Sequence, residues 1–285
     1  MSDISPTAVR RALGQRLRAL RVTRGLTVAE AADLVGCSQS KITKIELAQM
    51  AVTRDDVEKM LTVYGETDHE QLSLLLSMVR EGNRKEWWEG QRALLPKFGA
   101  YLGLESVAVS IHVYETHLIH GLLQTPGYAL ALLRKARPEL LEHEVSQLVD
   151  WRMRRQDVLT RGDHAPLELV TAMDEAALRR AIGGVDVMRA QLEHLVACSS
   201  MPIVTMHVMP DAMGAHAGLT GPLTILQFDP GTRPIAYVES QAGNLYMERD
   251  DDLRRCQQTM NQILADAPSP DQSLALIRQV AEEMR

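Results

Sequence analysis

The side chains with the clearest chemistry in this sequence are polar and cationic groups that gather between positions 39 and 44. They are Gln39, Ser40, Lys41, Thr43 and Lys44. Amide, hydroxyl and ammonium groups form hydrogen bonds with polar partners, and ammonium groups also attract negative charge. Because Ile42 and Ile45 interrupt this run at helical spacing, we expect a short helix that buries the isoleucines and offers the polar groups to solvent.

A helical hairpin is predicted to position this polar helix. Thr27 caps a first helix, and Glu30, three residues later, completes a reciprocal capping box. Gly36 ends that helix where a left-handed or crowded backbone is tolerated, and Ser38 caps the second helix. Ala32 is small where two steeply crossing helices nearly touch. This is the geometry of a helix-turn-helix, whose second helix enters the major groove of DNA.

An ordinary helical hairpin would show the same caps and turn, so the flanking segments decide between the two interpretations. The preceding helix places Leu13, Leu17 and Leu20 on one face. Its other faces carry Arg10, Arg11, Arg16, Arg18, Arg21 and Arg24. Thr53 and Asp56 form another capping box at the start of a fourth helix. A fifth helix is predicted around residues 69–81. The sequence therefore predicts a mainly α domain over residues 1–82, which opens with a loose leader at residues 1–8.

Residues 9–65 resemble the phage-repressor-type (Cro/XRE) DNA-binding domain. The segments LGQRLRALR and GLTVAEAADLVGCSQSKITKIE carry the resemblance. It implies that Gln39, Ser40 and Lys44 contact base edges. A glutamine can bond adenine at two places, and a lysine can bond the acceptors of guanine.

The same resemblance implies contacts to the DNA backbone and one ion pair within the domain. The residues expected at phosphates are Arg21, Lys41, Thr43 and Arg54. Phosphate contacts fix the register of a protein on DNA without reading its sequence. The ion pair joins Arg21 to Glu46, although a glutamate at that place could also be a solvated charge of little energetic value.

The charge of the chain is divided unevenly between its two parts. The net charge is −6, which argues against a protein covered with nucleic-acid contacts. Residues 1–50 nevertheless hold eight Arg and Lys against four Asp and Glu, or +4, so residues 51–285 carry −10. A basic head on an acidic body concentrates the attraction for phosphate on one part of the molecule.

The segment from Gly82 to Gly90, GNRKEWWEG, is predicted to join two domains. It is charged, contains two glycines and holds Trp87 and Trp88, of which we expect one to pack inward and one to lie in an interface. Beyond it, residues 83–285 are predicted to form an α+β domain. Strands are expected in series at residues 203–209, 223–228, 235–240 and 245–247, which favours an antiparallel sheet with helices against one face.

This second half resembles the large C-terminal domain of actinobacterial WhiJ-like regulators. The pieces HGLLQTPGYALALL, WRMRRQDVL, MDEAALRRAIGG, VMPDAMGAH and YVES occur in the same order. The resemblance implies a regulatory domain that follows a DNA-binding head. It also implies a small partner protein encoded next to it, in pairs described as antitoxin-like systems. No enzymatic activity follows from it.

Candidate catalytic and metal-ligating groups exist in this half, but no motif joins them. They are His112, His117, His120, His207, His216, Asp174, Glu175 and Glu239. His117 and His120 could place two imidazoles on one helix face, as a metal site requires, yet their segment has strand or turn character and lacks a third ligand. No GxSxG, P-loop, GxGxxG or HExxH occurs. We therefore expect no enzyme, no cofactor and no metal.

Cysteine use and hydropathy indicate the compartment. Cys37, Cys198 and Cys256 are far apart and form no CxxC, so neither a disulfide framework nor a zinc site is indicated. No signal peptide opens the chain and no apolar run is long enough to span a bilayer, so we expect a cytoplasmic protein.

The sequence as a whole predicts a sequence-specific DNA-binding transcription regulator that binds double-stranded DNA as a homodimer. Its acidic body is expected to bind a small partner protein or a small ligand. Two alternatives remain open: a protein-interaction module that binds DNA weakly, and a small-molecule sensor or enzyme with a vestigial head.

Overall fold

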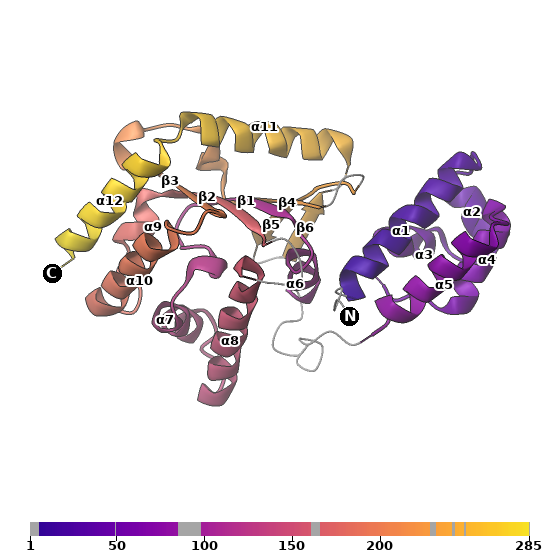
Figure 1. Ribbon diagram of the computed structural model, residues 1–285, viewed down its shortest axis with the longest axis horizontal. Coiled ribbons are helices and arrows are strands. Elements are labelled where there is room, and N and C mark those ends of the chain that lie inside the picture. Colours follow the sequence, from indigo (N-terminus) through magenta and orange to yellow (C-terminus); the bar gives the residue numbers. More distant parts are fainter. Residues whose placement is uncertain are drawn as a thin grey trace. The chain divides into compact units, whose positions relative to one another are not determined.

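The chain divides into two compact units, residues 1–107 and residues 108–285. The computed structural model describes residues 6–48, 50–84, 98–160, 166–228, 232–240, 243–247 and 249–284 (Figure 1). Most of the predicted junction, including Trp87 and Trp88, lies outside the described residues. The domain limits at residues 82 and 83 therefore stay a prediction.

The first unit contains the five predicted helices and one more. They are α1 (Pro6–Thr23), α2 (Val28–Val35), α3 (Gln39–Glu46), α4 (Arg54–Tyr64), α5 (His69–Gly82) and α6 (Gly99–Glu105). The expected loose leader is wrong for residues 6–8, because α1 begins at Pro6. Proline suits the first helical position, where its fixed φ is already helical and its missing N–H would have no partner.

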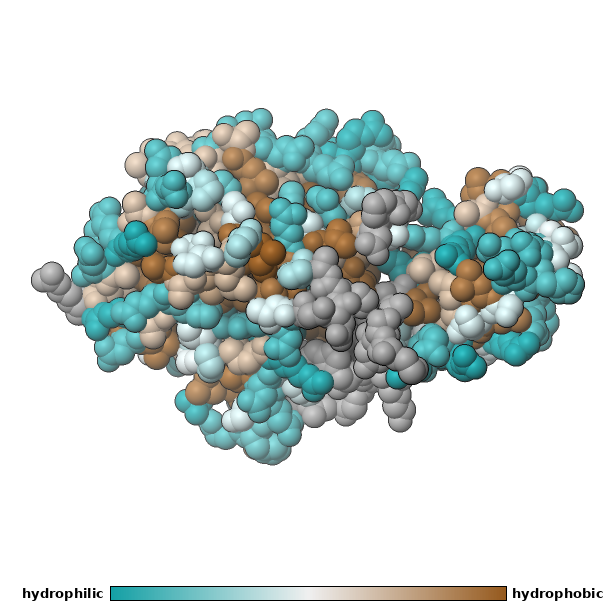
Figure 2. All heavy atoms as spheres, in the orientation of Figure 1, coloured by the Kyte–Doolittle hydropathy of each residue, from teal (hydrophilic) through white to brown (hydrophobic). Residues whose placement is uncertain are grey.

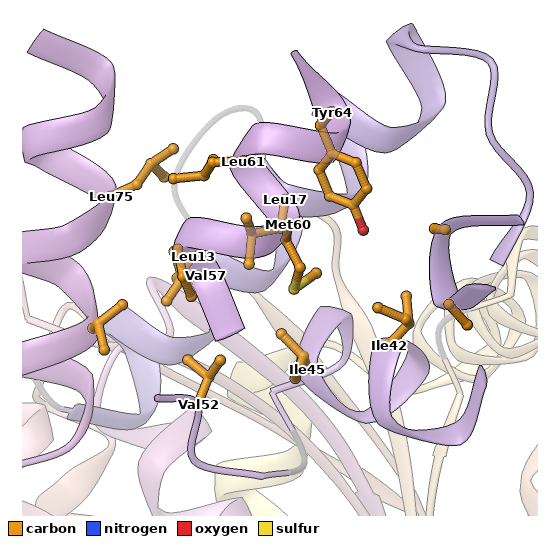
Figure 3. Packing of buried hydrophobic residues seen from close by; sticks show 13 residues of the cluster. Leu13, Leu17, Ile42, Ile45, Val52, Val57, Met60, Leu61, Tyr64 and Leu75 are labelled. Carbon is orange, nitrogen blue, oxygen red and sulfur yellow. The ribbon is translucent and has the colours of Figure 1, made fainter. Parts of the chain in front are cut away.

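A single apolar core joins α1 to α5 (Figure 3). Its larger members are Leu13, Leu17, Ile42, Ile45, Val57, Met60, Leu61, Tyr64 and Leu75. Ile42 and Ile45 are 0% and 3% exposed, so one side of α3 is fully used for packing. Burying an aliphatic side chain of this size stabilises the fold by about 1.5–3 kcal/mol. The rotation of α3 about its axis is set by these two residues.

The second unit is built on a six-stranded sheet with the order β3-β2-β1-β4-β5-β6. The strands are β1 (Ser110–Glu115), β2 (Glu168–Asp174), β3 (Val204–Met209), β4 (Leu223–Gln227), β5 (Ile235–Ser240) and β6 (Gly243–Met247). The α+β class is confirmed, and β4, β5 and β6 pair antiparallel as predicted. The sheet is mixed, however, because β1, β2 and β3 are parallel. Helices connect these three strands in sequence, and a crossover of that length returns the chain in the same direction.

Helices cover both faces of this sheet, and not one face as expected (Figure 1). They are α7 (Pro126–Ala136), α8 (Glu142–Arg155), α9 (Glu175–Arg179), α10 (Val185–Cys198), α11 (Asp250–Asp266) and α12 (Pro270–Glu283). Helix α11 packs Leu253, Met260 and Ile263 on the face that carries Tyr114 and Ile225. Its outward side is hydrophilic (Figure 2). Helices α7, α8 and α10 lie on the other side of the sheet.

Helix α1 approaches the end of α3 so closely that only glycine fits between them. A Cβ atom at Gly14 would lie 2.6 Å from the carbonyl oxygens of Ile45 and Glu46, far inside van der Waals contact. These oxygens belong to backbone that has little freedom to move. Gly14 therefore sets the distance between α1 and the polar helix, and sequence patterns did not single it out.

Replacing Gly14 by alanine should lower the free energy of unfolding by about 1–3 kcal/mol, the usual cost of overpacking. Gly127→Ala is the matched control, because a Cβ atom there meets its nearest neighbour, Val187, at an ordinary 3.6 Å. The control should leave stability unchanged or slightly raised, since alanine favours helix more than glycine does. Thermal unfolding followed by circular dichroism measures both, and equal effects would contradict the close approach.

Candidate nucleic-acid interface

The hairpin that carries α3 has the predicted caps. Thr27 Oγ1 accepts a hydrogen bond from the Glu30 N–H at 3.2 Å, and Glu30 Oε2 accepts one from the Thr27 N–H at 2.8 Å. Gly36 has a φ of 77°, in the left-handed region that favours glycine. Ser38 accepts from the Lys41 N–H at 3.2 Å and begins α3. These caps fix both ends of the turn and so the direction in which α3 leaves it.

Four of the five polar residues of α3 form one exposed face. Gln39, Ser40, Thr43 and Lys44 are all exposed. Their positions are spaced so that they lie together on the side of α3 opposite the buried isoleucines. The face presents an amide, two hydroxyls and an ammonium group, which are the donors and acceptors that base edges and phosphates require.

Beneath this face, Glu46 at the end of α3 forms a buried ion pair with Arg21 of α1, as predicted. Arg21 Nε lies 2.6 Å from Glu46 Oε1, and Arg21 Nη2 lies 2.9 Å from Glu46 Oε2. The third donor, Nη1, reaches the carbonyl oxygen of Leu26 at 2.7 Å. The two side chains are only 9% and 6% exposed. The hydrogen bond to Glu46 raises the pKa of Arg21 above its ordinary value.

Two roles were predicted for Arg21, and the structure supports the ion pair alone. A buried guanidinium whose donors bind Glu46 and Leu26 does not face a phosphate. Tyr64 of α4 lies close enough to this pair to act on the charge of Arg21. Burial, with Glu46 next in effect, raises the pKa of the Tyr64 hydroxyl. Tyr64 therefore stays neutral beside the pair, a proximity that its apolar spacing in the sequence did not reveal.

Lys41 differs from its exposed neighbours because it is held by α4. Its ammonium nitrogen lies 2.6 Å from Asp56 Oδ1, and Thr53 Oγ1 donates to Asp56 Oδ2 at 2.8 Å. Burial would raise the pKa of Asp56, but the hydrogen bonds from Lys41 and Thr53 bring it below its ordinary value. Asp56 thus joins α3 to α4, while Thr53, whose Oγ1 accepts from the Asp56 N–H at 3.2 Å, caps α4. The cap at Thr53 was predicted from the sequence, but the carboxylate of Asp56 accepts from the Thr53 hydroxyl and from Lys41, and its contact with Lys41 was not predicted.

The remaining predicted phosphate contact, Arg54, lies at the exposed start of α4. Its Nε is 2.8 Å from Glu58 Oε1, and the two side chains are 72% and 48% exposed. Such a pair opens at little cost, because solvent screens it. Six arginines were predicted on the outer faces of the first helix. Two of them, Arg11 and Arg21, are instead buried, at 6% and 7% exposure.

The candidate metal pair does not form in the second unit. His117 Nδ1 contacts Thr116 Oγ1 at 2.6 Å, while His120 is buried at 5% exposure. Across the described ranges, no group of three or more His, Cys, Asp or Glu side chains could hold a metal ion. Within those same ranges, no helix combines the length and the apolar character needed to cross a membrane.

Two family models match this chain, each over a different part of it. A model described as "Helix-turn-helix domain" matches residues 12–74, which span α1 to α5. A model described as "Domain of unknown function (DUF5753)" matches residues 98–279. The chain belongs to the DUF5753 family. Neither the curated proteins nor the solved structures contain a match to it.

These matches place a helix-turn-helix of the phage-repressor (XRE) type in front of the DUF5753 domain. The match to the helix-turn-helix model supports a DNA-binding regulator, because this motif places its second helix in the major groove. In this DUF5753 protein that helix is α3, the helix with the exposed polar face.

Replacing Glu46 by alanine should destabilise the first unit by about 3–5 kcal/mol, because Arg21 would be left buried without its partner. Glu58→Ala breaks the exposed pair with Arg54 and serves as the control, with an expected change within about 0.5 kcal/mol. Urea unfolding measures both. Similar small losses for the two variants would show that the buried pair is not a structural constraint.

Proposed function

We propose that this protein is a sequence-specific DNA-binding transcription regulator that works as a homodimer, with α3 in the major groove. The exposed face of α3 carries the proposal. Gln39, Ser40, Thr43 and Lys44 point to solvent from a helix whose other side is held by buried packing and by the pair between Arg21 and Glu46. A polar face on a firmly positioned helix suits base reading, which needs side chains held in place.

Within this proposal, base edges are read by Gln39, Ser40 and Lys44. Phosphates are contacted by Thr43, Lys41 and Arg54. Lys41 and Arg54 would each exchange a carboxylate partner, Asp56 or Glu58, for a phosphate oxygen. The exchange costs little for Arg54, because its pair with Glu58 is exposed. It costs more for Lys41, because Asp56 is only 17% exposed and would be left without this partner.

The small size of a single DNA-binding domain is the argument for a dimer. A single small domain buries too little surface for strong specific binding, and two-fold symmetric operators match two-fold symmetric proteins. We assign dimerisation and regulation to the DUF5753 domain. In this scheme it binds a small partner protein or a small ligand in the cytoplasm, in the manner of WhiJ-like, antitoxin-like regulators, and it catalyses no reaction.

Two other functions compete with this one. A protein-interaction module with weak DNA binding would show little difference between its preferred sequence and random DNA. A small-molecule sensor with a vestigial head would bind a ligand tightly and DNA not at all. Selecting preferred sites from random duplexes separates both from the regulator, because only the regulator enriches a symmetric sequence.

Lys44→Ala should weaken binding to the selected site by about 1–3 kcal/mol and relax base preference at one position. Lys41→Ala should weaken binding evenly across sequences and make the affinity less dependent on salt, because it removes one phosphate contact. Lys59→Ala is the control, since Lys59 pairs with Asp55 on the exposed surface of α4. Fluorescence anisotropy at several salt concentrations measures all three.

The outcome that contradicts the assignment is an equal, sequence-independent loss for Lys44→Ala and Lys41→Ala. Equal and weak binding to every duplex, before any substitution, would contradict the proposed function itself.

A further inference from the structure

Two sequence motifs of the DUF5753 domain, MDEAALRRAIGG and VMPDAMGAH, meet at the carboxyl ends of β2 and β3. The first places Asp174 at the end of β2 and Glu175 at the start of α9. The second ends β3 at Met209, opposite Asp174 in the strand register, and continues into the loop of residues 210–222 that leads to β4. The proposed DNA contacts use neither motif, so their role needs a separate explanation.

The first part of this loop is fixed to α9. Glu175 is buried, and its Oε2 accepts a hydrogen bond from the Asp211 N–H at 3.0 Å. Its Oε1 accepts another from Arg179 Nε, and Arg179 Nη1 donates to Glu283 of α12 at 2.8 Å. The base of the loop is therefore held by a carboxylate that uses both of its oxygens.

Beyond this base, two glycines bound the rest of the loop in conformations that other residues rarely adopt. Gly214 has a φ of 73° and Gly221 a φ of 124°. A Cβ atom at either position would meet no atom of the described residues within 4 Å. Backbone conformation, and not lack of space, therefore favours glycine at both places. We call the segment between them, residues 215–220, the lid.

The backbone hydrogen bonds of the lid are local among the described residues. The Leu219 N–H donates to the carbonyl oxygen of His216 at 3.3 Å, and the Gly221 N–H donates to that of Gly218 at 3.0 Å. These turns form the short helix η5 (Ala217–Thr220). A segment that shares no backbone bond with the sheet can move away without breaking a strand pair.

His216 attaches the lid to the sheet. The Gly218 N–H donates to His216 Nδ1 at 3.2 Å, so the neutral ring carries its proton on Nε2. This Nε2 lies 3.5 Å from Asp174 Oδ1, which also accepts a hydrogen bond from the Tyr114 hydroxyl at 2.6 Å. The imidazole meets the ring of Tyr114 edge-on, with 5.9 Å between the ring centroids. His216 thus closes the lid through one polar and one aromatic contact.

The backbone of Gly218 lies against the ring of Tyr114. A Cβ atom at Gly218 would lie 2.4 Å from Tyr114 Cζ and 2.8 Å from its hydroxyl oxygen. Tyr114 is fully buried, so the lid covers the hydroxyl end of this side chain. Ala217 packs beside it against the apolar cluster beneath α11. Leu219, in contrast, is 64% exposed.

We propose that the lid opens and closes on Gly214 and Gly221 while the sheet stays folded, with His216 as its latch. Opening uncovers the Tyr114 hydroxyl and the Asp174 carboxylate at the ends of two neighbouring strands. A simple connection from β3 to β4 needs neither two glycine conformations nor a glycine against an aromatic ring, and such features concentrate at moving segments. The lid is measured without DNA, so it and the proposed function can fail separately.

Hydrogen–deuterium exchange of the full-length protein, followed by mass spectrometry, tests the lid. Gly218→Ala leaves no room for the closed lid above Tyr114, and His216→Ala removes the latch. Each should speed exchange of the amides of residues 217–221 by roughly tenfold or more, the usual effect of losing a shielded polar contact. Exchange in β2 and β3 should not change, because local opening leaves the sheet intact.

Two substitutions serve as controls. Leu219→Ala changes an exposed side chain within the lid itself. His207→Ala removes an imidazole outside the lid, whose Nδ1 contacts the carbonyl oxygen of Pro268 at 2.8 Å. Neither control should alter exchange in residues 217–221.

Acetylation by N-acetylimidazole, located by mass spectrometry, reports whether the lid uncovers what lies beneath it. Tyr114 should become reactive in Gly218→Ala and in His216→Ala, because its hydroxyl is then exposed to the reagent. Tyr128 of α7 is the internal control: it is equally buried, and its hydroxyl accepts from the Ile119 N–H, so it should stay unmodified.

Three outcomes would overturn the proposal. One is unchanged exchange in the lid for both Gly218→Ala and His216→Ala. Another is an equal rise in the lid and in β2 and β3, since the segment would then open only when the sheet unfolds. Loss of folded structure in both variants, measured by circular dichroism, has the same meaning as the second.

Discussion

The first unit depends on one buried ion pair. The guanidinium of Arg21 meets the carboxylate of Glu46 through two parallel hydrogen bonds, and a backbone carbonyl takes its third donor. Removing both charges from water is costly, so such a pair contributes to geometry more than to stability. Its bidentate form fixes the end of α3 against α1 in one orientation, and that orientation decides which side chains of α3 face solvent.

Other contacts act with the pair to position the same helix. Gly14 permits α1 to approach the last turn of α3, Ile42 and Ile45 set its rotation, and Lys41 joins it to Asp56 of α4. Each contact uses a different kind of force: close packing, apolar burial and charge. Together they leave only the polar face of α3 available to a partner, which is the arrangement that base reading requires.

In the second unit, the carboxylates at the ends of two neighbouring strands differ in their hydrogen-bond partners. Asp174 ends β2, where it accepts a hydrogen bond from Tyr114 and lies 3.5 Å from His216. Glu115 ends β1, the adjacent parallel strand, and has no such partner among the described residues. A satisfied carboxylate stabilises its surroundings, whereas a desolvated and unpaired one lowers stability.

The sequence by itself determined α1 to α5 of the first unit, the caps at Thr27 and Ser38, and the exposed face of α3, because caps and apolar periodicity act over a few residues. The pair of Arg21 with Glu46 came from resemblance. Only the tertiary structure decided that β1, β2 and β3 run parallel and that Gly14 lies against the backbone of α3. These features join residues far apart in the chain, and strand direction and register depend on how the connections cross, which no local pattern records.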